Sequence, residues 1–213
     1  MKLIFLIVTI IAVFLFNCGN KAENQNAGKS VTNSVDEPED KIGVRGPLNF
    51  NGAEFKLSWA DHPRENYFIQ EYLPEGENLN RFNQMLTVHL FLSDMELKDA
   101  VKQKESELSA RKQTDPLCNY EISKNQDGNE YLADFLLSED KDGKTSIAEF
   151  NIYHYRQIDQ GNGKQAIAVY AFTKRAYDDD VTEFLKSLKN IRKDLIGKMA
   201  KTDKPDIKIM QSK

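Results

Sequence analysis

The stretch "QAIAVYAFT", residues 165–173, is apolar on both faces of an extended chain. A strand with one wet face alternates apolar and polar residues, whereas a strand covered on both sides reads as a nearly continuous apolar run. The stretch therefore predicts a central strand in a sheet that carries a covering layer on each face.

Three segments just before this strand also have the character of strands, and turn signals separate all four. Asp127-Gly128, Asp142-Gly143 and Gly161-Asn162-Gly163 supply residues that tolerate positive φ. Together with three earlier segments of alternating character, they predict a largely antiparallel sheet of about six to seven strands. Those segments are residues 53–59, 66–73, 87–93, 119–124, 130–138, 146–157 and 165–174.

Two long helices are expected beside the sheet. Ser93 and Glu96 form a capping-box pattern ahead of apolar residues that recur on one face, which predicts a helix over residues 94–112. A second helix is expected to begin near Asp180, to carry an apolar stripe and to end at Gly197.

A short helical piece is expected from Leu79 to Met85, before the third strand. The order of elements, with helices packed on an antiparallel sheet, predicts an α+β domain spanning residues 48–197.

The N-terminal segment is typical of a secreted protein. Leu3 to Phe16 is an apolar run that is too short to span a bilayer and fits a signal peptide. The sequence Leu15-Phe16-Asn17-Cys18-Gly19 resembles the lipobox of bacterial lipoproteins, in which the cysteine becomes a lipidated N-terminus. The resemblance implies a signal peptide over residues 1–17 and a lipid anchor at Cys18. The alternative is a signal peptide cut elsewhere, with Cys18 incidental.

Residues 18–47 are polar, contain no aromatic residue and are expected to form a disordered tether. Residues 198–213 are predicted to be a polar, lysine-rich tail. The net charge of −4 argues against a nucleic-acid partner. These features predict a domain held outside the cytoplasm in the cell envelope, and at the outer membrane if the cell has one, because Gly19 lacks the acidic inner-membrane retention signal.

The stretch "EYLPEGENLNRFNQMLTV", residues 71–88, resembles a phrase found in small secreted domains of the PsbP and DcrB type. The matching residues are Tyr72, Pro74, Gly76, Glu77, Met85 and Thr87, while Phe82 stands where those domains carry a tryptophan. The resemblance implies a PsbP-like fold. It implies no catalytic residues, since that superfamily shares none.

One segment fits part of a calcium-loop pattern. In "SEDKDGKTSIAE", residues 138–149, Asp140, Asp142 and Glu149 occupy ligand positions, but Ser138 stands where the first aspartate belongs. The flanking segments read as strands rather than helices, because they are rich in aromatic residues. The sequence therefore favours a hairpin turn at Asp142-Gly143 over a calcium site.

No other motif predicts a cofactor or a catalytic centre. His62, His89 and His154 lack the spacing of a zinc site, and Cys118 reads as a buried apolar residue. The run Asp178–Asp180 reads as charge at a helix N-terminus. The sequence contains no Gly-x-Ser-x-Gly elbow and no phosphate-binding loop.

The aromatic residues exceed what one face of a sheet needs, and a surplus on the second face is expected to form a binding surface. They are Tyr67, Phe68, Tyr72, Tyr120, Tyr131, Tyr153, Tyr155, Tyr170 and Phe172. We expect a non-catalytic, membrane-tethered lipoprotein that binds an envelope protein. Two alternatives stay open: a small-ligand carrier or enzyme, and a surface adhesin for a host protein. A lysine-binding kringle domain that takes the C-terminal Lys213 is one candidate host partner.

Overall fold

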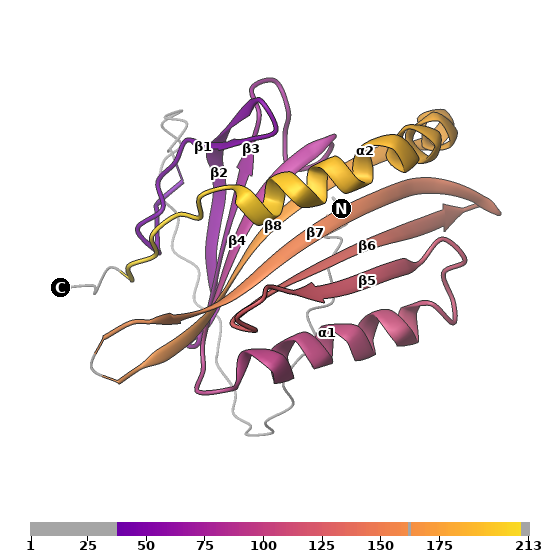
Figure 1. Ribbon diagram of the computed structural model, residues 1–213. Coiled ribbons are helices and arrows are strands. Elements are labelled where there is room, and N and C mark those ends of the chain that lie inside the picture. Colours follow the sequence, from indigo (N-terminus) through magenta and orange to yellow (C-terminus); the bar gives the residue numbers. More distant parts are fainter. Residues whose placement is uncertain (1–37, 162, 210–213) are drawn as a thin grey trace, which may run out of the picture. The chain divides into compact units, whose positions relative to one another are not determined.

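Within the residues that the structure describes, eight strands form one sheet with the order β1-β2-β3-β4-β8-β7-β6-β5 (Figure 1). The computed structural model describes residues 38–161 and 163–209. The strands are β1 (Leu48–Phe50), β2 (Ala53–Arg64), β3 (Tyr67–Leu73), β4 (Gln84–Leu92), β5 (Asn119–Lys124), β6 (Glu130–Lys141), β7 (Lys144–Asp159) and β8 (Gln165–Tyr177).

All neighbouring strands are antiparallel, and the sheet consists of two four-stranded meanders. The meanders join where β4 pairs with β8, from Gln84 opposite Lys174 to Leu92 opposite Ala166. Strand β8 therefore has a partner on each side, and residues 166–173 are buried. The expected central strand is confirmed.

The two helices lie on opposite faces of the sheet (Figure 1). Helix α1 (Leu97–Arg111) connects β4 to the far edge strand β5 and packs on β5, β6 and β7. Helix α2 (Val181–Lys201) follows β8 through the short 3₁₀ helix η1 (Asp178–Asp180). Its apolar stripe packs on β7 and β8 and contains Val181, Phe184, Leu188, Leu195 and Met199. We name the two sides of the sheet the α1 face and the α2 face.

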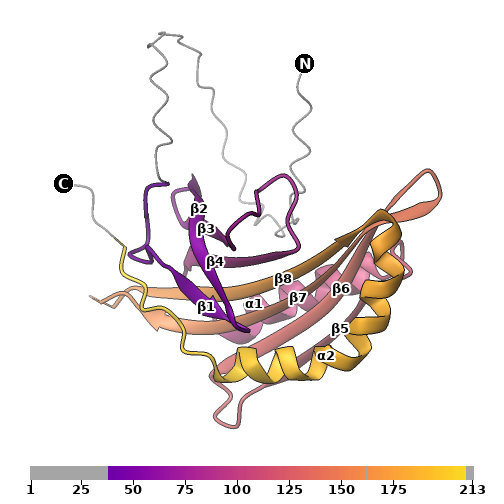
Figure 2. The ribbon, with the colours of Figure 1, turned by 90° about the horizontal axis from the view of Figure 1, so that it is seen from above.

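The sheet curls toward α2, so that its first strand lies over a strand far along the sheet (Figure 2). The rings of Phe50 on β1 and Phe172 on β8 are 4.6 Å apart, although β2, β3 and β4 lie between these strands in the sheet. The ring of Phe55 on β2 also packs edge-on against that of Phe172, with centroids 6.4 Å apart. The α2 face is thus the inside of a half-barrel, and its apolar interior forms the larger core.

The expected six- to seven-stranded, PsbP-like α+β domain is wrong, because the described chain is a curled half-barrel of eight strands with two helices. Strand β1 has only three residues, too few for its alternation to be visible in the sequence. Asn51 and Gly52, with φ of 50° and 81°, form the turn into β2. Asn-Gly is the strongest short-range hairpin signal, and it marks this missed strand.

The expected helix from Leu79 to Met85 is wrong as well. An isolated bridge joins Asn78 to Arg81, and β4 begins at Gln84. The side-chain Oδ1 of Asn78 accepts hydrogen bonds from the backbone N–H groups of Asn80 (3.0 Å) and Arg81 (3.2 Å). This local bonding replaces the backbone bonds of a helix.

Helix ends also differ from the expectation. Helix α1 begins at Leu97, and Glu96 and Ser93 do not form a capping box; Ser93 Oγ instead accepts from the N–H of Met95 at 3.1 Å. Helix α2 continues through Gly197 to Lys201, since an interior glycine costs a helix only about 1 kcal/mol relative to alanine and does not by itself end it.

The segment after α2 packs against the sheet. Ile207 is buried in the α2-face core, and the N–H of Lys208 donates to the carbonyl of Ile42 at 2.9 Å. Arg156 Nη2 donates to the carbonyl of Pro205. Residues 202–209 are therefore part of the folded unit.

Candidate functional site

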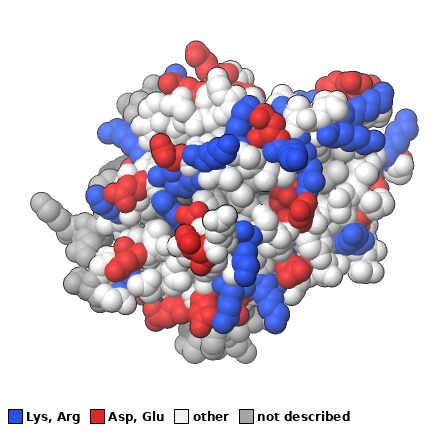
Figure 3. All heavy atoms as spheres, in the orientation of Figure 1, with Lys and Arg blue, Asp and Glu red and all other residues white. Residues whose placement is uncertain are grey.

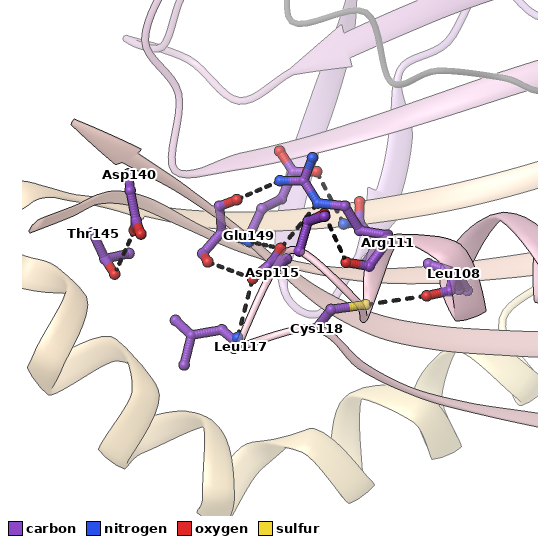
Figure 4. Close-up of polar contacts among 11 residues, drawn as sticks. Leu108, Arg111, Asp115, Leu117, Cys118, Asp140, Thr145 and Glu149 are labelled. Atoms are coloured by element: carbon purple, nitrogen blue, oxygen red, sulfur yellow. Dashed lines mark hydrogen bonds and ion pairs between the residues drawn. The ribbon is translucent and has the colours of Figure 1, made fainter. Parts of the chain in front are cut away.

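The calcium-loop candidates do not come together. Residues 130–159 form the β6–β7 hairpin, and its turn lies at Asp142 and Gly143, with φ of 55° and 75°. Asp140 accepts a hydrogen bond from Thr145 Oγ1 at 2.9 Å (Figure 4). Glu149 lies well along β7, where it binds Arg175. In residues 38–161 and 163–209, no group of three or more His, Cys, Asp or Glu side chains could hold a metal ion.

Cys118 has a structural position at the end of the loop that follows α1. It is buried, its Sγ donates to the carbonyl of Leu108 at 3.6 Å, and burial raises the pKa of its thiol (Figure 4). Beside it, Asp115 accepts hydrogen bonds from the N–H of Ser138 (2.7 Å) and from Nε of Arg111 (3.2 Å). These contacts fasten the loop to β6.

The three histidines have three different surroundings. His62 stacks on Phe68, with ring centroids 3.9 Å apart. His154 faces α2 and is only 4% exposed; its Nε2 lies 3.1 Å from Glu130 Oε2. His89 lies on the α1 face, on β4. Cys18 and Lys213 lie outside the described residues.

A continuous set of polar and aromatic side chains crosses the α1 face. Side chains of one face recur at every second residue of a strand, and cross-strand partners share that face. Glu71, Thr87, Ala171 and Tyr153 are successive partners on β3, β4, β8 and β7. We call the set around this row the polar–aromatic face: Trp59, Tyr67, Glu71, Thr87, His89, Lys104, Glu149, Asn151, Tyr153, Tyr155, Thr173 and Arg175.

One end of the polar–aromatic face is an ion pair with hydrogen-bonded support. Arg175 on β8 donates through Nε and Nη2 to Glu149 Oε2 on β7, with the Nε contact at 2.7 Å. The other carboxylate oxygen of Glu149 accepts from Asn151 Nδ2 at 2.9 Å, and Asn151 Oδ1 accepts from Thr173 Oγ1 at 2.8 Å. The guanidinium also stacks on Phe82, 4.2 Å from its ring centroid. Arg175 therefore gives two of its N–H groups to Glu149 and one face of its guanidinium to Phe82.

The other end is aromatic and lies under α1. Lys104 Nζ lies over the rings of Phe135 and Tyr153, at 5.4 and 5.3 Å. The same ammonium is paired with Glu107, at 3.0 Å. Tyr67 Oη lies 3.0 Å from Nδ1 of His89, and burial together with the charge of Lys104 lowers the pKa of His89 to about 3. His89 is therefore neutral at physiological pH.

Glu71 lies between these two ends, opposite Trp59 on β2 and Thr87 on β4. Its carboxylate makes no hydrogen bond or ion pair anywhere in the described part of the chain. Burial raises the pKa of Glu71 to about 7, and the charge of Arg175 acts against that rise. An acid without a partner on a partly covered face is unusual, because burying a charge is costly unless it is paired.

Several other polar atoms of the polar–aromatic face also lack a partner among the described residues: His89 Nε2 and the phenol oxygens of Tyr153 and Tyr155. Within residues 38–161 and 163–209, His154 Nδ1 is the one side-chain nitrogen or oxygen that is both shut off from solvent and unpartnered. His89, Tyr153 and Tyr155 are each only 5–6% exposed, so their polar groups lie within the packed α1 face, whereas the partly exposed Glu71 can be reached by a solute.

The expected surplus of aromatic residues is divided between the two faces. Phe68, Tyr72, Tyr170 and Phe172 belong to the core under α2. Tyr120, Tyr131, Tyr153 and Tyr155 belong to the cluster under α1. Tyr67 lies on the same face as the second group, stacked on Phe91 at 4.6 Å between centroids.

Sequence reasoning did not find Glu71, Arg175, Asn151 or Lys104 as site residues. Each is an ordinary polar residue in its own segment, and only the pairing of distant strands brings them onto one face. A usable signal was present in "NYFIQEYL", where Glu71 is the one charged residue of the strand.

The charges on the surface seen in Figure 3 are mixed, with lysine and arginine interspersed among aspartate and glutamate. In the described residues, no helix is both long enough and apolar enough to cross a membrane.

A protein-family model matches residues 42–203. Because this match covers more than half of the chain, the chain belongs to that family. No curated protein and no solved structure matches the chain. None of these comparisons supports the resemblance to PsbP and DcrB domains.

Proposed function

We propose that the protein is a non-catalytic, membrane-tethered binding protein whose polar–aromatic face takes a small ligand. The observation that supports this most is the carboxylate of Glu71, which lies among polar and aromatic side chains and has no partner in the described part of the chain. Binding sites for small molecules combine apolar and aromatic walls with a few convergent polar groups.

A protein partner is the other candidate, and the surface favours it less. A docking surface for a protein exposes aromatic or large apolar side chains. Among the described residues, Leu79 is the one exposed large hydrophobic side chain, at 40% exposure. The titratable groups of the polar–aromatic face, by contrast, have shifted pKa values, which is typical of ligand sites.

The tether belongs to the same proposal. The apolar run Leu3–Phe16 followed by Cys18 supports a lipid anchor in the cell envelope, outside the cytoplasm. Replacing Cys18 with Ala would then leave unprocessed precursor and release the protein from the detergent phase. A Cys18→Ala chain that is processed and partitions like the wild type would remove the anchor from the proposal.

Ligand binding is tested by thermal shift with four probe classes: primary and quaternary amines, carboxylic acids, phosphate esters and neutral sugars. At least one class is expected to raise the melting temperature, because a ligand that binds only the native state stabilises it. The Tyr153→Phe/Thr87→Val variant removes two polar groups of the face and should lose the shift. Glu54→Gln, an exposed position on β2, is the matched control. No shift with any class overturns the proposal.

A further inference from the structure

Trp59 and Glu71 are cross-strand partners at the open edge of the polar–aromatic face. The side chains of directly opposed residues in an antiparallel pair start about 5 Å apart, so the indole and the carboxylate are neighbours. Trp59 and Glu71 are both partly exposed. A solute can therefore reach both groups.

The charges nearby leave Glu71 without a counter-ion. Arg175 gives its hydrogen bonds to Glu149 and stacks on Phe82, and Lys104 is paired with Glu107. His89, on the neighbouring strand, is neutral at physiological pH. The two cations of the polar–aromatic face are thus each paired with another carboxylate. Glu71, whose pKa is about 7, is mostly ionised at pH 8, where it has no ion pair of its own among the described residues and only the charge of Arg175 offsets it.

We propose that Glu71 and Trp59 form a cation-binding subsite, so that the ligand of the polar–aromatic face carries an amine or a quaternary ammonium group. The inference rests on the proposed function and names its ligand class. A carboxylate attracts the positive charge, and a tryptophan face is the strongest aromatic partner for an ammonium group. Thr87, on the other side of Glu71, can accept a hydrogen bond from a primary amine.

Anionic ligands fit this position poorly. A carboxylate or phosphate beside Glu71 would meet a like charge, and the nearest guanidinium already serves Glu149. A neutral sugar could donate hydrogen bonds to the carboxylate but would bring no positive charge to balance it.

Trp59 is the single tryptophan of the chain, so its fluorescence reports on this position alone. The purified protein is titrated at pH 8 with choline and with 3,3-dimethylbutan-1-ol, its uncharged carbon analogue. Choline is expected to change the fluorescence of Trp59 in a saturable way. The uncharged analogue is expected to bind at least about tenfold more weakly. Glu71→Gln should weaken choline binding about tenfold as well, whereas the Glu54→Gln control should bind like the wild type.

Any of four results overturns the inference. Equal binding of choline and its uncharged analogue, or unchanged binding by Glu71→Gln, removes the role of charge. If carboxylates, phosphates or sugars raise the melting temperature and amines do not, the cation-binding subsite is wrong, whereas the proposal that the face binds a small ligand is kept. If no probe class binds at all, both proposals fail.

Discussion

Trp59 on β2 lies directly opposite Glu71 on β3, and the carboxylate of Glu71 has no partner in the described part of the chain. The fold creates this pair through a bulge, because the register of β2 and β3 shifts between Leu57 and Trp59. Without that shift, Trp59 would change faces and point toward the α2 core. The bulge therefore places the one tryptophan beside the one acid that lacks a counter-charge on the polar–aromatic face.

Glu71 is expected to make the stability of the protein depend on pH. Its pKa is raised from 4.5 to about 7 in the folded protein, so the native state binds the proton more tightly than the unfolded state. The stabilisation that protonated Glu71 gives to the native state is fully present below pH 4.5 and is lost as pH rises through about 7. The loss is up to about 3 kcal/mol, since one pKa unit corresponds to about 1.4 kcal/mol.

The check is urea denaturation between pH 5 and 8 of the wild type and Glu71→Gln. The variant should be more stable relative to the wild type at pH 8 than at pH 5. A difference in stability between the two proteins that does not change with pH would mean that the pKa of Glu71 is not raised by burial.

His154 is expected to give the stability of the protein the opposite pH dependence. Burial, together with the charge of Lys204, lowers its pKa from 6.5 to about 4. The stability from neutral His154 is present above pH 6.5 and is lost as pH falls toward 4, by up to about 3 kcal/mol. His154→Phe should therefore lose less stability than the wild type between pH 7 and 4.5 in urea denaturation. Parallel curves for the two proteins would contradict this origin of acid sensitivity.

The pair of Glu149 and Arg175 is expected to stabilise the face only while both partners are present. Arg175→Met leaves the Glu149 carboxylate buried and unpaired, which should cost about 3 kcal/mol. The double variant Arg175→Met/Glu149→Leu should recover most of that loss, because no buried charge remains. Equal destabilisation of the single and double variants, measured by denaturation, would show that packing rather than charge is lost.

The segment after α2 should contribute to stability. Ile207 is 7% exposed in the α2-face core, so Ile207→Ala is expected to destabilise the protein by about 2–4 kcal/mol. Lys208→Ala, next to it and exposed, is the control and should change stability by less than about 0.5 kcal/mol. If Ile207→Ala behaves like Lys208→Ala, residues 202–209 do not hold their place against the sheet.

The central part of the fold was predictable because periodicity reports burial directly. The doubly apolar stretch 165–173 identifies β8, and Asp142-Gly143 identifies the β6–β7 turn. Strand β1 was missed because three residues carry no period, although the Asn51-Gly52 turn was visible. The helix expected at residues 79–85 does not form, and the side chain of Asn78 instead accepts hydrogen bonds from the backbone N–H groups of Asn80 and Arg81.

The site was not predictable for a different reason. Glu71, Thr87, Tyr153 and Arg175 come together only through the pairing of β3 with β4, β4 with β8 and β8 with β7. One of these pairings, β4 with β8, joins segments about 80 residues apart in sequence, which local patterns cannot specify. The calcium-loop residues, by contrast, lie close together in sequence, but Glu149 lies along β7 and binds Arg175, away from the turn at Asp142.

A chemical-shift map shows directly whether a cationic ligand binds beside Glu71 and Trp59. The ¹⁵N-labelled protein is titrated with choline, and the backbone amide shifts are followed at pH 8. We expect saturable shifts centred on Trp59, Glu71 and Thr87, absent in Glu71→Gln, with the amides of α2 unmoved. Shifts that spare these three residues, or that are the same in Glu71→Gln, would contradict it.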